Sequence, residues 1–221
     1  MSEYYLEDNP PASSQYSDRL VEEVGLGYVH TAEGVMDNIG LDTGAENTAH
    51  FISTRTNPGC YGEIGDSDSI VKMIPYNKAA FHIVSRDAYD VNLRHCSRSF
   101  SFATAAHLWG TDPAWDASAL ALMGETMAEY FLDLASRRAG YEAEMSLRWL
   151  TQTEAGLRQP GLCLHGTSQP SDRTDAWVNN PLRPQLEATL IEEISKHILT
   201  PSPVPPPKPP SVDRRLLILE P

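Results

Sequence analysis

Residues 161–177 read GLCLHGTSQPSDRTDAW, and this stretch joins a structural signal to a chemical one. The apolar run GLCL predicts a short core strand that ends at His165. A loop rich in Gly, Ser, Pro and Asp follows, with Arg173 eight and Asp175 ten positions after His165. Because a loop of this composition can turn back on itself, the Asp175 carboxylate can lie beside the His165 imidazole. The stretch therefore indicates a strand end where His165 and Asp175 could bind one metal ion.

A hydrolytic zinc site usually has three protein ligands and keeps a fourth position for water. His30 is the leading candidate for the third ligand, since LVEEVGLGYVHT (residues 20–31) predicts a strand that ends on it. The next segment, TAEGVMDNIG (residues 31–40), resembles a short helix. Four other histidines lie beside apolar residues, where a hydrogen-bonded structural role is commoner: His82, His95, His107 and His197. The spacing alone leaves two interpretations open, a metal site and a surface loop with an incidental histidine.

The remaining elements predict a domain of the α/β class. Three segments with β-branched and aromatic residues predict strands of one sheet: TAHFIST (48–54), SDSIVKMIP (67–75) and AAFHIVS (79–85). Apolar residues recur every three or four positions over 115–138 and again over 184–198, which is the period of an amphipathic helix. Asp112 and Pro113 suit the start of the first helix, and Gly140 suits its end.

The chain is expected to form one domain with loose ends. Its 221 residues, with 41% hydrophobic content, can bury one sizeable core. Residues 1–18 are polar and show no hydrophobic period, which predicts a flexible leader. Residues 200–221 contain PSPVPPPKPP, which favours an extended, polyproline-like tail. We therefore expect the folded domain over residues 19–199.

Charge and composition exclude several classes of partner. The chain has 17 Lys and Arg against 30 Asp and Glu, a net charge of −13, which argues against binding nucleic acid by neutralising phosphates. Three cysteines are an odd number and too few for a disulfide framework, so reduced thiols of a cytosolic chain are expected. The acidic N-terminal stretch does not resemble a signal peptide, and no apolar run predicts insertion into a membrane.

Four motifs together resemble those of a known enzyme family. They are YVHTAEG around His30, the run Thr48-Ala49-His50-Phe51, the pair Phe81-His82 followed by Asn92, and the set His165, Arg173 and Asp175. Residues 19–198, which contain these motifs, resemble the type-2 N-acetylmuramoyl-L-alanine amidases. That family shares the peptidoglycan-recognition-protein fold and includes many phage lysins. The last motif is the most specific, because its spacing is identical to that of the family's His-Lys-Asp version.

The resemblance implies a central mixed β-sheet flanked by helices, and a zinc hydrolase activity. It implies three Zn²⁺ ligands: His30, His165 and Asp175. It implies three substrate contacts: His50, His82 and Asn92. The substrate is expected to be bacterial peptidoglycan, cut at the amide bond between N-acetylmuramic acid and L-alanine. We expect a monomeric lysin that stays in the host bacterial cytoplasm until its release to the cell wall.

Two residues are candidates for catalysis beside the metal. Arg173 stands where the family has Lys; its charge can stabilise an oxyanion, but a guanidinium does not give up a proton. Glu33 lies three positions after His30 and is the nearest carboxylate in sequence to an expected ligand. Glu33 is a candidate for moving a proton, although a solvated Glu in the first turn of a helix is the commoner explanation.

Three further positions depart from the family pattern. Ala49 stands where many relatives have a catalytic Tyr, and Ser99 or Ser101 stands where many have Glu. The pair Ala176-Trp177 replaces a Pro-Gly pair. These departures leave three alternatives to an amidase: an inactive peptidoglycan-binding module, a phage structural or interaction protein, and another zinc hydrolase of the wall such as an endopeptidase.

Overall fold

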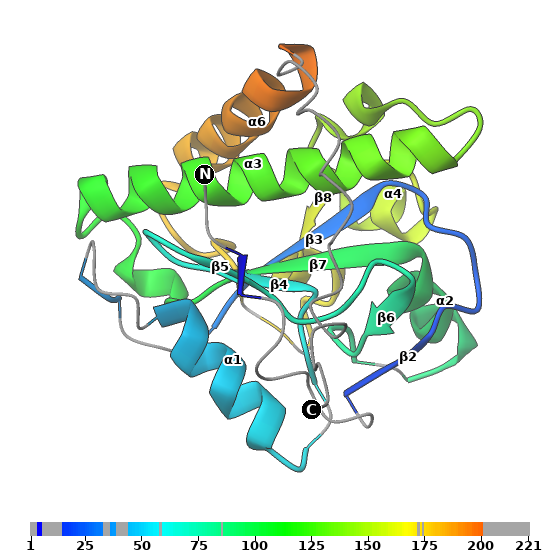
Figure 1. Ribbon diagram of the computed structural model, residues 1–221, viewed down its shortest axis with the longest axis horizontal. Helices are drawn as coiled ribbons and strands as arrows, with labels where there is room; N and C mark the ends of the chain where they lie inside the picture. The colour runs from blue at the N-terminus through cyan, green and yellow to red at the C-terminus, as the bar shows by residue number, and fades with distance from the viewer. Residues whose placement is uncertain are drawn as a thin grey trace, which may run out of the picture.

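A six-stranded mixed sheet forms the centre of the computed structural model (Figure 1), which describes residues 4–5, 15–32, 36–38, 44–57, 59–84, 86–171, 173 and 175–200. In spatial order its strands are β1 (Tyr4–Tyr5), β5 (Ile70–Lys72), β4 (Glu63–Gly65), β7 (Ser97–Phe102), β3 (Leu26–Thr31) and β8 (Gly161–Leu164). Neighbouring strands are parallel except β4 and β5, which form an antiparallel pair. The predicted α/β class with a central mixed sheet is confirmed.

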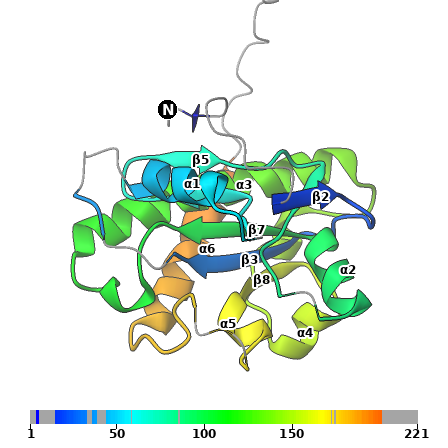
Figure 2. The same cartoon turned by 90° about the horizontal axis from the view of Figure 1, so that it is seen from below.

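Helices cover both faces of this sheet. The long helix α3 (Pro113–Arg137) lies on one face, and α6 (Arg183–Leu199) packs on α3 (Figure 1). The other face carries α1 (Gly44–Thr54) and α2 (Ala88–Cys96). Two short helices, α4 (Gln152–Gly156) and α5 (His165–Ser168), lie side by side next to β8 (Figure 2). Short 3-10 turns span Ala106–Leu108 and Ala143–Ser146.

The side chains of β7 alternate between the two faces of the sheet. Phe100 and Phe102 are fully buried and belong to the core that α3 and α6 complete. Since successive side chains of a strand point to opposite faces, Ser97, Ser99 and Ser101 point away from that core. They lie on the face that carries α1 and α2, and all three are buried. This second face therefore holds hydroxyl groups inside the protein.

The two predicted amphipathic helices are confirmed as α3 and α6, and the start of α3 has a local cause. The Asp112 side chain accepts hydrogen bonds from the backbone N–H groups of Ala114 and Trp115 at the start of α3. Pro113 occupies the first helical position, where no N–H partner is required. Helix α6 packs closely on α3 because Gly124 has no side chain; a Cβ there would collide with Glu193.

The strand predicted for TAHFIST is wrong, because these residues form the last seven positions of α1. Ala45, Ala49 and Ile52 are buried at spacings of four and three, which is the period of a helix. The Asp66 carboxylate accepts a hydrogen bond from the backbone N–H of Ala45 at 2.6 Å and so caps the helix start. The cap comes from 21 residues further along the chain, so no local signal marked this helix.

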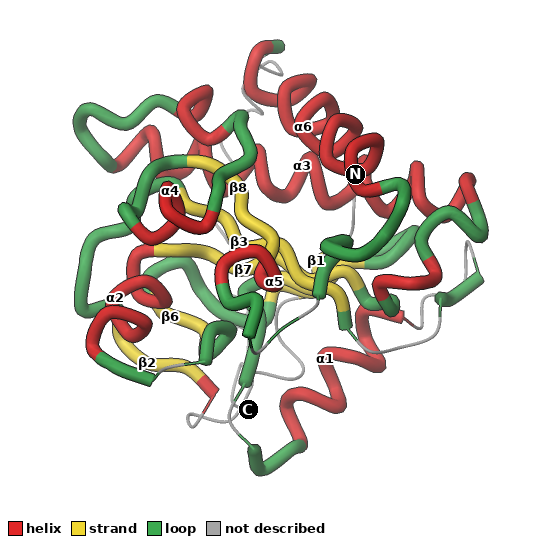
Figure 3. The backbone as a smooth tube through the Cα atoms, turned by 180° about the vertical axis from the view of Figure 1, so that it is seen from behind, coloured by secondary structure: helices red, strands yellow, loops and turns green. Residues whose placement is uncertain are grey.

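The folded unit begins earlier than predicted. Strand β2 (Tyr16–Asp18) lies within the expected leader over residues 1–18 and pairs with β6 (Lys78–Ala80) in a separate two-stranded antiparallel sheet. Figure 3 shows these two strands beside α2. The fully buried Gln15 side chain accepts from the Gly59 N–H at 2.8 Å and donates to the Arg55 carbonyl at 3.1 Å. Of AAFHIVS, only the first two residues are in a strand, and that strand is outside the main sheet.

Several predicted segments lie outside the described residues. They are residues 201–221 of the expected tail, most of the leader, and residues 33–35 and 39–40 of the short helix expected over residues 31–40. The described residues of that segment are not helical: Thr31 ends β3, and residues 32 and 36–38 have no regular structure. In the part of the chain that the structure describes, no helix is long and apolar enough to cross a membrane.

Candidate metal centre

His30, His165 and Asp175 meet where β3 and β8 end. The two strands are parallel neighbours, with Val29 opposite Leu164, so the residue after each of these is a histidine at the same edge of the sheet. His165 is also the first residue of α5, which contacts the ends of both strands (Figure 3). The Gly166 N–H donates to the Asp175 carbonyl at 2.7 Å and closes the loop between them. Any side chain on residue 166 would collide with that carbonyl.

The three side chains form one compact group. Oδ2 of Asp175 lies 3.2 Å from Nδ1 of His30 and 3.3 Å from Nδ1 of His165. All of the potential ligand atoms lie within 4.8 Å of one another. The two imidazoles are 1% and 3% exposed, whereas the Asp175 side chain is 13% exposed. The structure thus brings together the three residues that the sequence nominated as metal ligands, and leaves their carboxylate nearest to solvent.

Gln169 shows which nitrogen of His165 carries the proton. The Gln169 amide is held on both sides by Val84, since its Nε2 donates to the Val84 carbonyl at 3.0 Å and its Oε1 accepts from the Val84 N–H at 3.1 Å. The same Oε1 lies 3.0 Å from Nε2 of His165. Because an amide oxygen only accepts, Nε2 of His165 must carry the hydrogen. In a neutral His165, Nδ1 then presents a lone pair to Asp175.

A lone pair that faces a carboxylate is unfavourable unless a cation lies between them. Oδ1 of Asp175 is buried and has no hydrogen-bond partner among the described residues, although it lies 3.2 Å from Nδ1 of His165. Two imidazole nitrogens and a carboxylate oxygen are a donor set that zinc binds in hydrolytic sites. The residues present therefore fit a zinc ion.

The electrostatics of the group keep its members ready to bind a cation. Burial, with the nearby His165, lowers the pKa of His30 to about 4. Burial opposes ionisation of Asp175, but the adjacent His165 and His30 outweigh it and hold the pKa of this carboxyl below its ordinary value. At neutral pH His30 is thus a neutral imidazole and Asp175 a carboxylate, which are the forms that bind metals.

A second acidic group has an ordinary structural explanation. Asp37, Asp66 and Asp68 also place carboxylate oxygens within 4.8 Å of one another. Asp66, however, accepts from the backbone N–H groups of Ser69 at 2.9 Å and of Ala45 at 2.6 Å, and Asp37 accepts from the Trp115 indole. These bonds fix a turn and a helix start.

Tyr61 lies at the metal group, and sequence reasoning missed it. Its ring centroid is 5.0 Å from that of His30, and the residue stands two positions before β4. Burial, with the negative charge of Asp175, raises the pKa of Tyr61 to about 12, so that the phenol stays protonated at neutral pH. Ser101, opposite His30 in the strand register, lies on the same face of the sheet. No local pattern links Tyr61 to His30, because the sheet register alone brings them together.

The predicted catalytic and substrate residues are dispersed. Arg173 is exposed, and its positive charge contributes to lowering the pKa of His30. Glu33 lies outside the described residues. His50 is exposed on α1 and Asn92 is half-buried on α2. Only His82 adjoins the metal group: its Nδ1 lies 3.3 Å from Nε2 of His30.

Two residues of the motifs lie in the interior of the protein. His82 is buried behind His30, a position that suits support of His30 better than contact with a substrate. Ala49, which stands where many relatives of the resembled family have a catalytic Tyr, is buried in the packing of α1. Two tyrosines lie near the metal group: Tyr61, twelve positions after Ala49, and Tyr28, whose ring centroid is 6.4 Å from that of His30.

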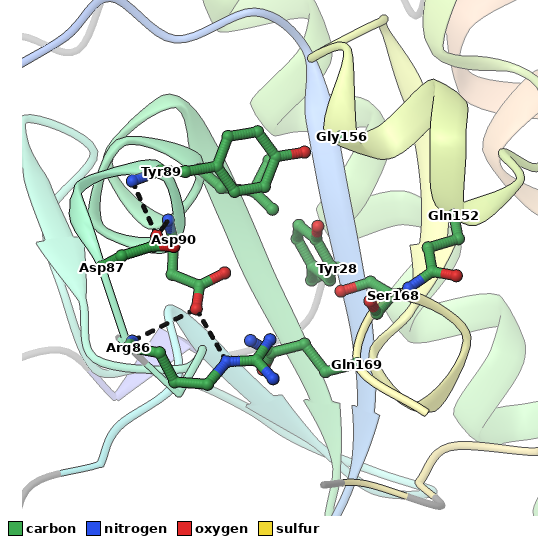
Figure 4. Close-up of a pocket in the computed structure, with 10 residues that line it drawn as sticks. Tyr28, Arg86, Asp87, Tyr89, Asp90, Gln152, Gly156, Ser168 and Gln169 are labelled. Atoms are coloured by element: carbon green, nitrogen blue, oxygen red, sulfur yellow. Dashed lines mark hydrogen bonds and ion pairs between the residues drawn. The ribbon is translucent and has the colours of Figure 1, made fainter. Parts of the chain in front are cut away.

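A pocket of about 410 Å³ adjoins the metal group and shares Gln169 with it (Figure 4). Figure 4 shows Arg86 and Asp90 on one wall, paired at 3.1 Å, with Ser168 on the opposite side and Tyr28 between them. The ring of Tyr28 is 6.5 Å from that of His165, centroid to centroid. The volume and polar lining suit a small polar group of a substrate.

Comparison with solved structures identifies the fold. The chain is similar to a mutant endolysin from Bacillus subtilis, at 10% identity over 88% of this chain and 99% of that chain, with a TM-score of 0.53. It is similar to the Staphylococcus aureus hydrolase AmiA in complex with its ligand, at 12% identity over 88% of this chain and 83% of that chain, with a TM-score of 0.54. The PlyG catalytic domain is similar at 10% identity over 91% of this chain and 99% of that chain, with a TM-score of 0.53.

These neighbours define a class of fold. The chain has the type-2 amidase fold, which endolysin catalytic domains share, as the motif resemblance implied. No family model matches the sequence, and no curated protein matches it. At 10–12% identity the likeness establishes the fold, and the chemistry has to be argued from the metal group itself.

Proposed function

We propose that this protein is a zinc-dependent N-acetylmuramoyl-L-alanine amidase that cuts bacterial peptidoglycan. One observation carries the proposal: in a fold shared with endolysins, Gln169 leaves His165 with a lone pair that faces the Asp175 carboxylate, with His30 beside them. This arrangement is favourable with a cation between the side chains. The fold and the donor set together favour a hydrolase of the cell wall over a structural protein of the phage.

The chain's own residues divide the work of hydrolysis. His30, His165 and Asp175 would hold Zn²⁺, which supplies the Lewis acidity that activates water and polarises an amide carbonyl. The protonated Tyr61 phenol, beside His30, can donate a hydrogen bond to the negative charge that develops on the carbonyl oxygen. Arg173 adds a positive charge near the same place, and its exposure lets it reach a bound substrate.

Proton transfer to the leaving amine has two candidates in this proposal. Tyr61 can donate its hydroxyl proton, because the phenol is neutral at working pH. Glu33 remains a prediction from its position three residues after His30. A guanidinium does not release a proton in this pH range, so Arg173 acts only through its charge.

We further propose that the polar pocket beside His165 accommodates part of the peptidoglycan peptide. The pocket offers a guanidinium, carboxylates, a hydroxyl and amide groups within one cavity, which suits a peptide that carries both charge signs. Local contacts of this kind are needed because the net charge of −13 gives no long-range attraction to an anionic wall. In the cell, the protein is proposed to act as a monomer on the wall after release from the host cytoplasm.

Product analysis tests the proposed bond. Purified protein with zinc is incubated with peptidoglycan, and the released peptides are analysed by mass spectrometry and by labelling of new amino groups. An amidase releases stem peptides with N-terminal alanine. New amino groups on other residues would identify an endopeptidase, and wall binding without any product would identify an inactive binding module. Tyr61→Phe should bind the wall as the parent does and lose most of the rate.

A further inference from the structure

A buried chain of hydrogen bonds leads away from His30 on the side opposite Asp175. Nε2 of His30 lies 3.3 Å from Nδ1 of His82, and Nε2 of His82 lies 3.2 Å from the hydroxyl oxygen of Ser97. The Ser97 hydroxyl in turn lies 2.8 Å from the Leu93 carbonyl and 3.4 Å from the Arg94 carbonyl. The chain therefore connects the metal group to the C-terminal end of α2.

The far end of the chain fixes its direction. Carbonyl oxygens only accept, so Ser97 donates its single hydroxyl hydrogen to the last turn of α2. The final carbonyls of a helix lack intrahelical donors and carry the negative end of its dipole, which favours a hydroxyl donor there. The Ser97 oxygen must then accept from Nε2–H of His82. The first link thus determines which nitrogen of His82 carries a proton.

The direction of hydrogen-bond donation at Ser97 also determines which nitrogen of His30 carries the hydrogen. A neutral imidazole has one N–H and one lone pair, so a His82 that donates through Nε2 accepts through Nδ1. The donor to that lone pair is Nε2–H of His30, at 3.3 Å. His30 is left with its lone pair on Nδ1, the nitrogen that faces Asp175 at 3.2 Å. The opposite direction would put a hydrogen on Nδ1 of His30 and block a metal ion there.

We propose that His82 and Ser97 are positioning residues that hold His30 in the tautomer that offers Nδ1 to the metal. The inference rests on the metal site of the proposed function and adds residues that contact no ligand. Gln169 fixes the tautomer of His165 in another way: its amide is held by two hydrogen bonds to Val84, and its oxygen accepts from Nε2 of His165. The lone pairs of His30 and His165 thus face the same point. Each tautomer is fixed by a buried hydrogen-bond acceptor of its own.

Zinc affinity tests this relay. Zinc is titrated against a chromogenic chelator for the parent, Ser97→Ala and His82→Leu. Loss of a buried partner of a metal-binding histidine typically weakens metal binding by about 10–100-fold, and we expect that range for His82→Leu and about tenfold for Ser97→Ala. Asn places its amide oxygen as many bonds from Cα as Nδ1 of His, so His82→Asn keeps the acceptor and should stay within about threefold of the parent.

Ser99→Ala is the matched control. Ser99 is buried two positions along β7 from Ser97, and its hydroxyl oxygen accepts from the Gly62 N–H at 2.8 Å. Ser99→Ala loses the bond from Gly62, and Ser97→Ala loses the bond to Leu93 as well as the one from His82, so both variants should have lowered melting temperatures. Only Ser97→Ala should weaken zinc binding. Equal zinc affinity in the two variants would overturn the relay.

Nitrogen NMR of the imidazole rings in the zinc-loaded parent reads the tautomers directly. We expect the hydrogen on Nε2 in both His30 and His82; a hydrogen on Nδ1 of His82 would contradict the proposal. This measurement tests the proposal even if the His82→Leu protein fails to fold, because it uses the parent. A parent that takes up no zinc would overturn the metal site of the proposed function, whereas a parent that binds zinc as tightly as Ser97→Ala would overturn the relay alone.

Discussion

The two faces of the central sheet differ in what they carry: one face packs aromatic rings, and the other holds the metal group. On the side of α3 and α6, Phe100 and Phe102 of β7 pack against aromatic rings such as Phe131 and Trp109. On the other side, Ser97 and Ser101 of the same strand lie among histidines and Tyr61. The first face buries most of the aromatic core, together with the ion pair of Arg98 and Glu63. The second uses buried hydrogen bonds, which add little net stability but fix the direction of each side chain.

The largest expected effect separates stability from metal binding. Phe131 is fully buried against Phe100 and Tyr130. Phe131→Ala should lower the free energy of unfolding by about 3–5 kcal/mol through lost burial and the cavity left behind. Zinc affinity of the folded protein should stay near that of the parent. Urea unfolding and chelator competition measure the two quantities.

The matching change on the polar face is Asp175→Asn. It removes the carboxylate and keeps the shape, so zinc binding should be lost while the fold persists. A Phe131→Ala protein that loses zinc binding while folded, or an Asp175→Asn protein that unfolds, would show that the two faces are not separable in this way.

Arg173 gives the next effect in size. If its role is electrostatic, Arg173→Ala should lose on the order of a hundredfold in wall-hydrolysis rate, about 2.7 kcal/mol, while Arg173→Lys keeps a substantial part of it. Zinc content should be unchanged in both, because a guanidinium is not a ligand. In Arg173→Lys an alkaline loss of rate should appear as the ammonium deprotonates. If the Arg173→Ala protein hydrolyses the wall as fast as the parent, Arg173 is a charged loop residue with no part in catalysis.

Lowering the pH should reduce the free energy of unfolding through the buried histidines His30 and His82. Burial, with His165, lowers the pKa of His30 to about 4, and burial lowers the pKa of His82 well below its ordinary value. Between about pH 6.5 and pH 4 the unfolded chain binds protons that the folded protein does not, so stability present above this window is lost as the pH falls through it. For His30 the loss is about 1–3 kcal/mol.

Urea unfolding of the metal-free protein between about pH 7 and pH 4.5 measures this loss. His30→Asn removes the titrating ring and should give a flatter profile. A free energy of unfolding that stays constant over this range in the parent would mean that the two histidines are hydrated in the metal-free protein.

The apolar face was the more predictable one, for a physical reason. Helix α3 follows from a local period and from a cap, Asp112, that adjoins it in sequence. The nearness of His165 and Asp175 follows from a loop of ten positions. Tyr61 reaches His30 only through the order of β4, β7 and β3. Such contacts depend on the order of the strands in the sheet, which no local pattern of this sequence indicates.

The same reason explains the failures on the polar face. The sequence predicts a strand for part of α1 because the β-branched and aromatic residues there suit a sheet. The cap of this helix, Asp66, belongs to a distant turn and gives no local signal. The link from His30 through His82 to Ser97 joins residues 52 and 15 positions apart. A histidine beside apolar residues looked structural from sequence. The structure shows that His82 is structural in that sense and adjoins the metal group as well.

Metal content tests the central claim most directly. The protein is purified without added chelator, equilibrated with zinc and desalted, and its zinc is measured by mass spectrometry for the parent, His30→Ala and His165→Ala. The account predicts about one zinc per chain in the parent and its loss in both variants, together with loss of wall hydrolysis. Full retention of zinc in both folded variants, or a parent that holds none, would contradict the site formed by His30, His165 and Asp175.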